Sequence, residues 1–105
     1  MITFIDYSGR IVRYPDERQA HVAERHPYME DHVELIEGTL SDPDEVRMSA
    51  EDPDTVILYY RWYWHSLVGA KYVRVVVKLL DQDAFVLTAH VTDNIRRGEL
   101  VWTRR

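Results

Sequence analysis

A chain of 105 residues without cysteine is predicted to fold as one domain held by packing alone, since two domains would each be too small to bury a stable core. Cysteine absence excludes disulfides and thiolate metal sites, and a formal net charge of -5 argues against a broad nucleic-acid-binding surface. No basic leader begins the chain and no apolar run approaches the roughly 20 residues of a membrane span, so we expect a cytoplasmic protein without membrane contact.

The first predicted elements are a β-hairpin and a helix. Residues 2–6 and 10–14 are β-prone runs, and Gly9 between them suits a tight turn because glycine accepts positive φ. Pro15 fits the first turn of a helix, where its missing N–H is not needed. We therefore expect a helix over residues 16–25.

A second helix is predicted over residues 29–40, after Pro27 has ended the first one. Its apolar residues recur at the helical period and form one stripe: Met29, Val33, Ile36 and Leu40. The later segments read as strands, at about residues 45–49, 56–63, 71–80 and 84–91. Residues 93–105 are either a short last strand from Leu100 or a loosely attached arm. The predicted class is α+β, with the hairpin and two helices on one face of an antiparallel sheet of four or more strands.

Strand periodicity predicts which side chains share a face of this sheet. In the 71–80 strand, one face carries Val73, Val75, Val77 and Leu79, which are the expected partners of the helix stripe. In the 84–91 strand the matching face carries Phe85, Leu87, Ala89 and Val91. The opposite face carries a set of polar residues: Arg74, Lys78, Thr88 and His90. A buried sheet face would exclude such residues, and a sheet face that only contacts solvent would not need them.

Aromatic residues crowd the 56–63 strand and its end, where Trp64 follows Tyr63. Such density fits a platform on which nucleic-acid bases stack, each worth about 1–3 kcal/mol. Burial of these side chains in the core explains the same density, and it is the commoner reason for aromatic side chains in strands.

The strongest candidate for chemistry is the segment that holds His21, Arg25 and His26. His21 and Arg25 lie one helical turn apart, so an imidazole that can move a proton stands beside a guanidinium that can stabilise a phosphate. The alternative is that His21 covers the apolar seam and Arg25 is solvated. The histidines show no metal-binding spacing such as HExxH, and there is no glycine-rich phosphate loop, so we expect neither a metal nor another cofactor.

Several short motifs, in this order, resemble those of the phage- and toxin-associated nucleases of the barnase–EndoU–colicin–RelE superfold. They lie between residues 17 and 98: His-x-x-x-Arg-His-Pro at 21–27, Thr-Leu-x-x-Pro-Asp-x-Val at 39–46, Tyr-Tyr at 59–60, Val-Val-Val-Lys at 75–78 and Leu-Thr-Ala-His at 87–90. The resemblance implies an endoribonuclease that needs no metal. The ribose 2′-hydroxyl would attack the adjacent phosphorus and leave a 2′,3′-cyclic phosphate and a 5′-hydroxyl.

The resemblance also implies roles for individual residues. His21 would be the general base or acid, and Arg25 and Lys78 would balance charge on the phosphorane. Thr88 would bind a phosphate oxygen, and His90 would be either the second proton-transfer group or part of the wall. The predicted substrate-binding residues are His26, Tyr60, Arg74 and Arg97.

Two other functions remain open from the sequence. The first is a binding module without catalysis on the same scaffold, which would hold a protein or RNA through residues 59–64. The second is a dimeric prophage accessory protein whose polar sheet face is the interface. Under the ribonuclease hypothesis the expected partners are RNA and an antitoxin or immunity protein.

Overall fold

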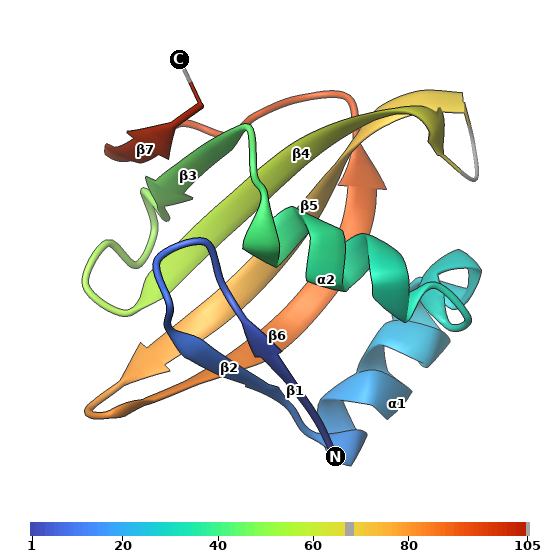
Figure 1. Cartoon of the computed structure of the whole chain (residues 1–105), viewed down its shortest axis with the longest axis horizontal. Coiled ribbons are helices and arrows are strands. Elements are labelled where there is room, and N and C mark those ends of the chain that lie inside the picture. Colours follow the sequence, from blue (N-terminus) through green and yellow to red (C-terminus); the bar gives the residue numbers. More distant parts are fainter. Residues whose placement is uncertain (67–68, 105) are drawn as a thin grey trace.

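The computed structural model describes residues 1–66 and 69–104, and in these residues two α-helices pack on one seven-stranded sheet (Figure 1). The elements in chain order are β1 (Ile2–Ile5), β2 (Ile11–Tyr14), α1 (Asp16–Arg25), a 3-10 helix (Pro27–Met29), α2 (Val33–Ser41), β3 (Glu45–Met48), β4 (Val56–Ser66), β5 (Gly69–Leu80), β6 (Asp83–Thr92) and β7 (Leu100–Thr103). The α+β class, the hairpin and the first helix are confirmed, but the hairpin does not lie on a face of the sheet with the helices, because β2 pairs with β6 and makes the hairpin part of the sheet itself.

The strands lie in the order β1-β2-β6-β5-β4-β3-β7. Neighbouring strands are antiparallel except for β2 and β6, which run parallel and pair only at Arg13 and Phe85. The prediction of a wholly antiparallel sheet is therefore wrong at this junction. Short turns force antiparallel pairing, but β2 and β6 are joined by a long connection that contains both helices and three strands, so no turn fixes their direction.

The second helix begins later than predicted. Pro27 starts a separate 3-10 helix, and His32 has φ -125° and ψ 49°, which is outside the helical region, so α2 starts at Val33. Met29 nevertheless reaches the core, where 1% of its surface is exposed. The predicted apolar stripe is thus correct as a set of core residues but combines two helical segments.

One face of the sheet packs against the helices and forms the core. Val22 of α1 and Ile36 and Leu40 of α2 are fully buried there. They meet alternate residues of the central strands, as strand periodicity predicted: Ile57, Tyr59, Val73, Val75, Val77 and Ala89. In Figure 1 the viewer looks at this helix-covered face, with α2 crossing in front of the sheet.

A β-bulge interrupts β6. Val76 of β5 lies opposite Thr88, whereas the next residue, Val77, lies opposite Val86. Leu87 is therefore an extra residue in β6, and an extra residue reverses which side chains face the core. The bulge divides β6 into two segments of opposite parity.

The two segments differ in how well their faces were predicted. In the C-terminal segment, Thr88 and His90 lie on the face away from the helices, as expected, and we call this face the second face. In the N-terminal segment, Val86 is fully buried in the core. The predicted core positions of Phe85 and Leu87 are therefore wrong.

In the described C-terminal residues, Leu100–Thr103 form a strand of the sheet and not a loose arm. Strand β7 pairs with β3, and residues 93–99, the crossing loop, connect β6 to β7 (Figure 1). The backbone N–H of Arg96 donates to the hydroxyl of Tyr60 (3.0 Å), and the guanidinium of Arg74 donates to the carbonyl of Asn94 (3.1 Å). The loop therefore lies directly over the centre of the second face.

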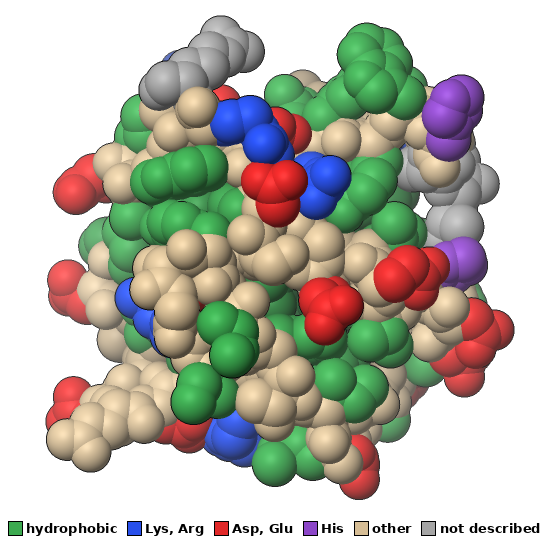
Figure 2. Space-filling model, viewed as in Figure 1, with side chains coloured by type: hydrophobic (Ala, Val, Ile, Leu, Met, Phe, Trp, Pro, Cys, Tyr) green, Lys and Arg blue, Asp and Glu red, His purple; other side chains and the backbone are tan. Residues whose placement is uncertain are grey.

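Acidic side chains are spread widely over the helix-covered face, as Figure 2 shows. The crossing loop on the opposite face carries two exposed cations, Arg96 and Arg97. Within the described residues, neither helix has the length and apolar character that a membrane span requires.

Candidate functional site

Arg74 occupies the centre of the second face and is held rigidly. Only 5% of its surface is exposed. Its guanidinium donates to the Tyr60 hydroxyl (3.0 Å), to Nε2 of His90 (2.8 Å) and to the carbonyl of Asn94 (3.1 Å). A guanidinium carries five N–H donors, so these three bonds leave donors for a further acceptor. Arg74 is a fixed positive charge with hydrogen-bonding capacity to spare.

His90 is kept neutral by this arrangement. Arginine only donates, so the Nε2 that faces Arg74 must carry the lone pair and the proton must sit on Nδ1. Burial, followed by the charges of Arg74, His26 and Arg96, lowers the pKa of His90 to about 4. Nδ1 itself is buried and has no hydrogen-bond partner among the described residues. Both nitrogens are thus inaccessible here, and the arrangement favours a positioning role for His90 over proton transfer.

His26 lies directly on His90. The two imidazole rings are stacked with centroids 5.0 Å apart and an interplanar angle of 28°. Nδ1 of His26 lies 3.5 Å from the hydroxyl of Tyr28, which in turn accepts a hydrogen bond from the backbone N–H of Val91. Burial, then the charges of His21 and Arg25, lower the pKa of His26, so it is mainly unprotonated near neutral pH.

Helix α1 runs beside the part of β6 that has no neighbouring strand. Arg18 of α1 donates to the carbonyl of Leu87 at this edge (3.4 Å), and His21 and Arg25 follow Arg18 on the same side of the helix. His21 makes no hydrogen bond with any described residue. Both groups are close enough to His26 for their charges to lower its pKa.

The fold therefore brings together five of the residues singled out in the sequence, and we call them the β6-edge cluster: His21, Arg25, His26, Arg74 and His90. Helix α1 was expected to lie on the core side of the sheet and Arg74 on the opposite side. They meet because α1 ends at the free edge of β6, where side chains from the two sides can approach each other.

A cavity of about 340 Å³ opens on the second face beside the cluster. Arg74, His90 and Thr88 line it, and the hydroxyl of Thr88 is buried without a partner among the described residues. Arg96 of the crossing loop forms part of its wall. Sequence reasoning did not assign Arg96, although the cationic character of the C-terminal residues was visible, because only the path of the loop places it here.

Lys78 lies apart from the β6-edge cluster. Its ammonium donates to the hydroxyl of Thr55 (2.9 Å) and lies 3.5 Å from a carboxylate oxygen of Asp52, which lines the same cavity. Lys78 follows Arg74 by four residues along β5, which separates their backbones by about 13 Å. The two cations share a face, but their charged groups are held by different partners.

The other two predicted substrate-binding residues are placed differently. Tyr60 is fully buried beneath the crossing loop, where its hydroxyl accepts hydrogen bonds from Arg74 and from the backbone of Arg96. It therefore contributes by holding Arg74. Arg97 is exposed on the crossing loop and forms no hydrogen bond or ion pair with a described residue.

In the part of the chain that the structure describes, no three histidine or acidic side chains are arranged to hold a metal ion. The imidazoles of His21 and His26 have no strong hydrogen-bond partner among the described residues. The neutral imidazole of His90 is bound to the buried guanidinium of Arg74, and further guanidinium groups nearby are exposed. Comparisons with protein-family models, with curated proteins and with solved structures gave no match.

Proposed function

We propose that this chain is a metal-independent endoribonuclease whose site is the β6-edge cluster. The observation that carries the proposal is the contact series from His26 to His90 to Arg74, in which the His26 imidazole stacks on the His90 ring that binds a fixed guanidinium. Cleavage of RNA by its own 2′-hydroxyl needs these parts: a base, an acid and positive charge at the phosphorus. The resemblance of the sequence motifs to phage- and toxin-associated nucleases supports the same reaction.

In the proposed reaction, His26 accepts the proton of the 2′-hydroxyl as its oxygen bonds to phosphorus. The bond from phosphorus to the 5′-oxygen breaks, and His21 donates a proton to that oxygen. The products are a 2′,3′-cyclic phosphate and a 5′-hydroxyl. The lowered pKa of His26 suits the base, because the unprotonated form predominates at neutral pH.

The guanidinium groups stabilise the negative charge of the phosphorane. Arg74 supplies a charge that needs no reorganisation, because Tyr60, His90 and Asn94 already hold it in place. Arg25 is exposed beside His26 and can approach the phosphate from solvent. The backbone of Lys78 is about 13 Å from that of Arg74 along β5. Lys78 would therefore bind a neighbouring phosphate of the same RNA.

The test is cleavage of end-labelled single-stranded RNA in the presence of EDTA, with identification of the product ends. We expect cyclic phosphate ends from the wild type and a loss of about 100-fold or more in His21→Ala and His26→Ala, the usual contribution of a general acid or base. His65→Ala is the matched control, because His65 is exposed near the end of β4. Absence of cleavage across varied RNAs by folded protein, or equal rates in all four proteins, would refute the proposal.

A further inference from the structure

A second cavity, of about 390 Å³, lies on the same face of the sheet near the ends of β4 and β5. Three aromatic rings line it. Trp62 contacts Trp64 (centroids 5.5 Å apart, planes at 83°) and Tyr72 (4.9 Å, 74°), so both neighbours stand nearly perpendicular to it. Trp64 is 73% exposed, which is unusual for so large an apolar side chain. We call this site the Trp62 cavity.

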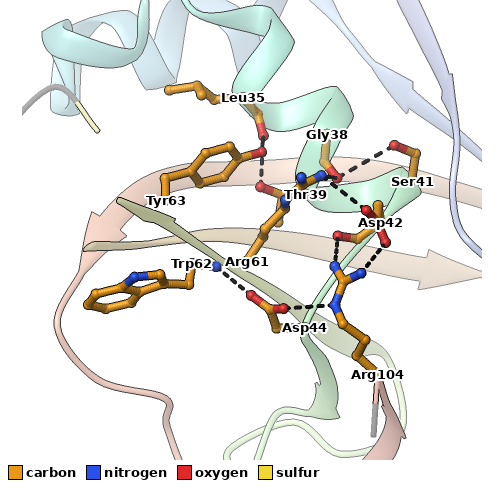
Figure 3. Close-up of polar contacts among 10 residues, drawn as sticks. All are labelled: Leu35, Gly38, Thr39, Ser41, Asp42, Asp44, Arg61, Trp62, Tyr63 and Arg104. Carbon is orange, nitrogen blue, oxygen red and sulfur yellow. Dashed lines mark hydrogen bonds and ion pairs between the residues drawn. The ribbon is translucent and has the colours of Figure 1, made fainter. Parts of the chain in front are cut away.

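The charged groups at the rim of the Trp62 cavity are already paired with each other. Asp44 accepts hydrogen bonds from the backbone N–H of Trp62 (2.6 Å) and from Nε of Arg104 (2.9 Å), as Figure 3 shows. Glu45 binds Arg47 (2.9 Å). Aromatic cages that hold ammonium ligands rely on unpaired negative charge and ring faces. Here the carboxylates are neutralised, so the rim offers donors and acceptors to a neutral ligand.

The Trp62 cavity is connected to the β6-edge cluster by a short series of contacts. Tyr72 contacts the ring of Tyr60 (6.2 Å between centroids), and the guanidinium of Arg74 lies 5.2 Å from the centre of that same ring. The crossing loop passes over Tyr60 between the two sites and exposes Arg96 and Arg97 to solvent. A strand that joined the two sites would therefore pass Arg97 and Arg96, of which Arg96 lies 3.9 Å from a carboxylate oxygen of the exposed Glu51.

We propose that the Trp62 cavity binds a base of the same single-stranded RNA whose phosphate occupies the β6-edge cluster, with Arg96 and Arg97 contacting the phosphates between them. This inference rests on the proposed ribonuclease function. A nucleobase is planar, neutral and edged with donors and acceptors, which matches the exposed rings and the paired rim. Stacking on an aromatic side chain accepts any base, so the site secures the strand without selecting a sequence.

The test uses binding of a short RNA in which every 2′-hydroxyl is methylated, so that no attack on phosphorus can occur. Its affinity is measured by fluorescence anisotropy beside that of a chain of equal length that lacks bases. We expect Trp64→Ala to weaken binding of the base-containing RNA by about 5- to 150-fold, which corresponds to one stacked base. Binding of the abasic chain should not change, because its phosphates meet the same cations.

Leu80→Ala is the matched control, since Leu80 is also a large exposed apolar residue (51%) but lies at the other end of β5. The inference is overturned if Trp64→Ala binds like the wild type, if the wild type does not distinguish the two chains, or if neither chain binds. It is also overturned if choline displaces the RNA in a Trp64-dependent manner, which would indicate a cation site. Because the RNA cannot be cleaved, this result is independent of the cleavage assay, and either claim can fail alone.

Discussion

The imidazole of His26, at the end of helix α1, stacks on the imidazole of His90, on the second face at the free edge of β6. Burial lowers the pKa of each ring, and the positive charges around the two rings lower it further. A bound phosphate would oppose these effects, because a negative charge favours the protonated form of a nearby imidazole. The pair is thus arranged to remain neutral until an anion arrives.

The lowered pKa of His90 predicts how stability depends on pH. The unfolded chain titrates this histidine near its ordinary value of about 6.5, and the folded protein does so at about 4. Between these values the unfolded state binds more protons, so stability falls as pH falls through this window. Because His90 is partly exposed, we expect a contribution of about 1–2 kcal/mol, less than the full shift would give.

Urea denaturation of wild type and His90→Gln at pH 7 and pH 4 measures this contribution. Glutamine can still accept a hydrogen bond from Arg74 but does not titrate. The variant should therefore lose less stability than the wild type over this interval. His65→Gln, which changes an exposed histidine, should behave like the wild type. An identical pH dependence for His90→Gln and wild type would show that His90 is not held neutral by the fold.

Gly98 sets the path of the crossing loop. A Cβ atom at this position would lie 1.9 Å from the carbonyl oxygen of Met48, which is backbone and cannot move aside cheaply. We expect Gly98→Ala to displace the loop, weaken the Arg74 to Asn94 contact and cost about 1–3 kcal/mol of stability.

Gly9→Ala is the matched control for Gly98→Ala. Gly9 has φ +91°, but an added Cβ would meet nothing within 4 Å, so only backbone strain of about 1 kcal/mol opposes the change. Thermal denaturation compares the two variants, and cleavage assays check whether the displaced loop also lowers activity. Equal stability loss in both, with full activity in Gly98→Ala, would contradict the role given to the loop.

Asp6 is a buried carboxylate, and Tyr59 is one of its hydrogen-bond donors beside Ser8 and Arg10. The hydroxyl of Tyr59 donates to it (2.5 Å), and burial raises the pKa of Tyr59, so the hydroxyl stays protonated. Tyr59→Phe removes this donor and should cost about 1–3 kcal/mol. Tyr63→Phe removes a hydroxyl that lies 3.4 Å from the carbonyl of Leu35 and should cost about 0.5 kcal/mol or less. Similar urea midpoints for the two variants would show that the Asp6 contact contributes little.

The cations of the crossing loop predict a salt-dependent affinity for RNA. Each phosphate contact in a single strand contributes about 0.7 to the slope of log affinity against log salt. Arg97→Ala should lower the slope by about this amount, since Arg97 is exposed on the loop. Arg13→Ala removes a cation that is paired with Asp83 at the other end of β6 and should leave the slope unchanged. A lower slope in Arg13→Ala together with an unchanged slope in Arg97→Ala would place the RNA on a different surface.

The sequence predicted the parts of the fold that depend on local periodicity. The alternation of valines from Val73 to Val77 located the core face of β5, and Gly9 and Pro15 marked the hairpin and the first helix. The bulge at Leu87 escaped prediction because an extra residue in a strand shows no local signal. The faces predicted from strand alternation were therefore wrong in the segment of β6 before the bulge and correct in the segment after it.

The candidate site was predictable residue by residue but not as an arrangement. His21, Arg25 and His26 could be grouped from helical spacing, and Arg74 and His90 from strand parity. Their meeting depends on where α1 ends relative to the edge of β6, which is a tertiary property. The same holds for Arg96, whose position depends on a loop that crosses the sheet.

The central claim is that the stacked histidines and Arg74 form a phosphate site, and a histidine titration by NMR tests it most directly. The imidazole signals of the wild type are followed from about pH 3 to pH 8, with and without the methylated RNA. The account predicts that His90 titrates at about 4 in the free protein and that the pKa values of His26 and His90 both rise when the RNA binds. Titration of His90 near its ordinary value, or bound RNA that leaves both pKa values unchanged, would contradict it.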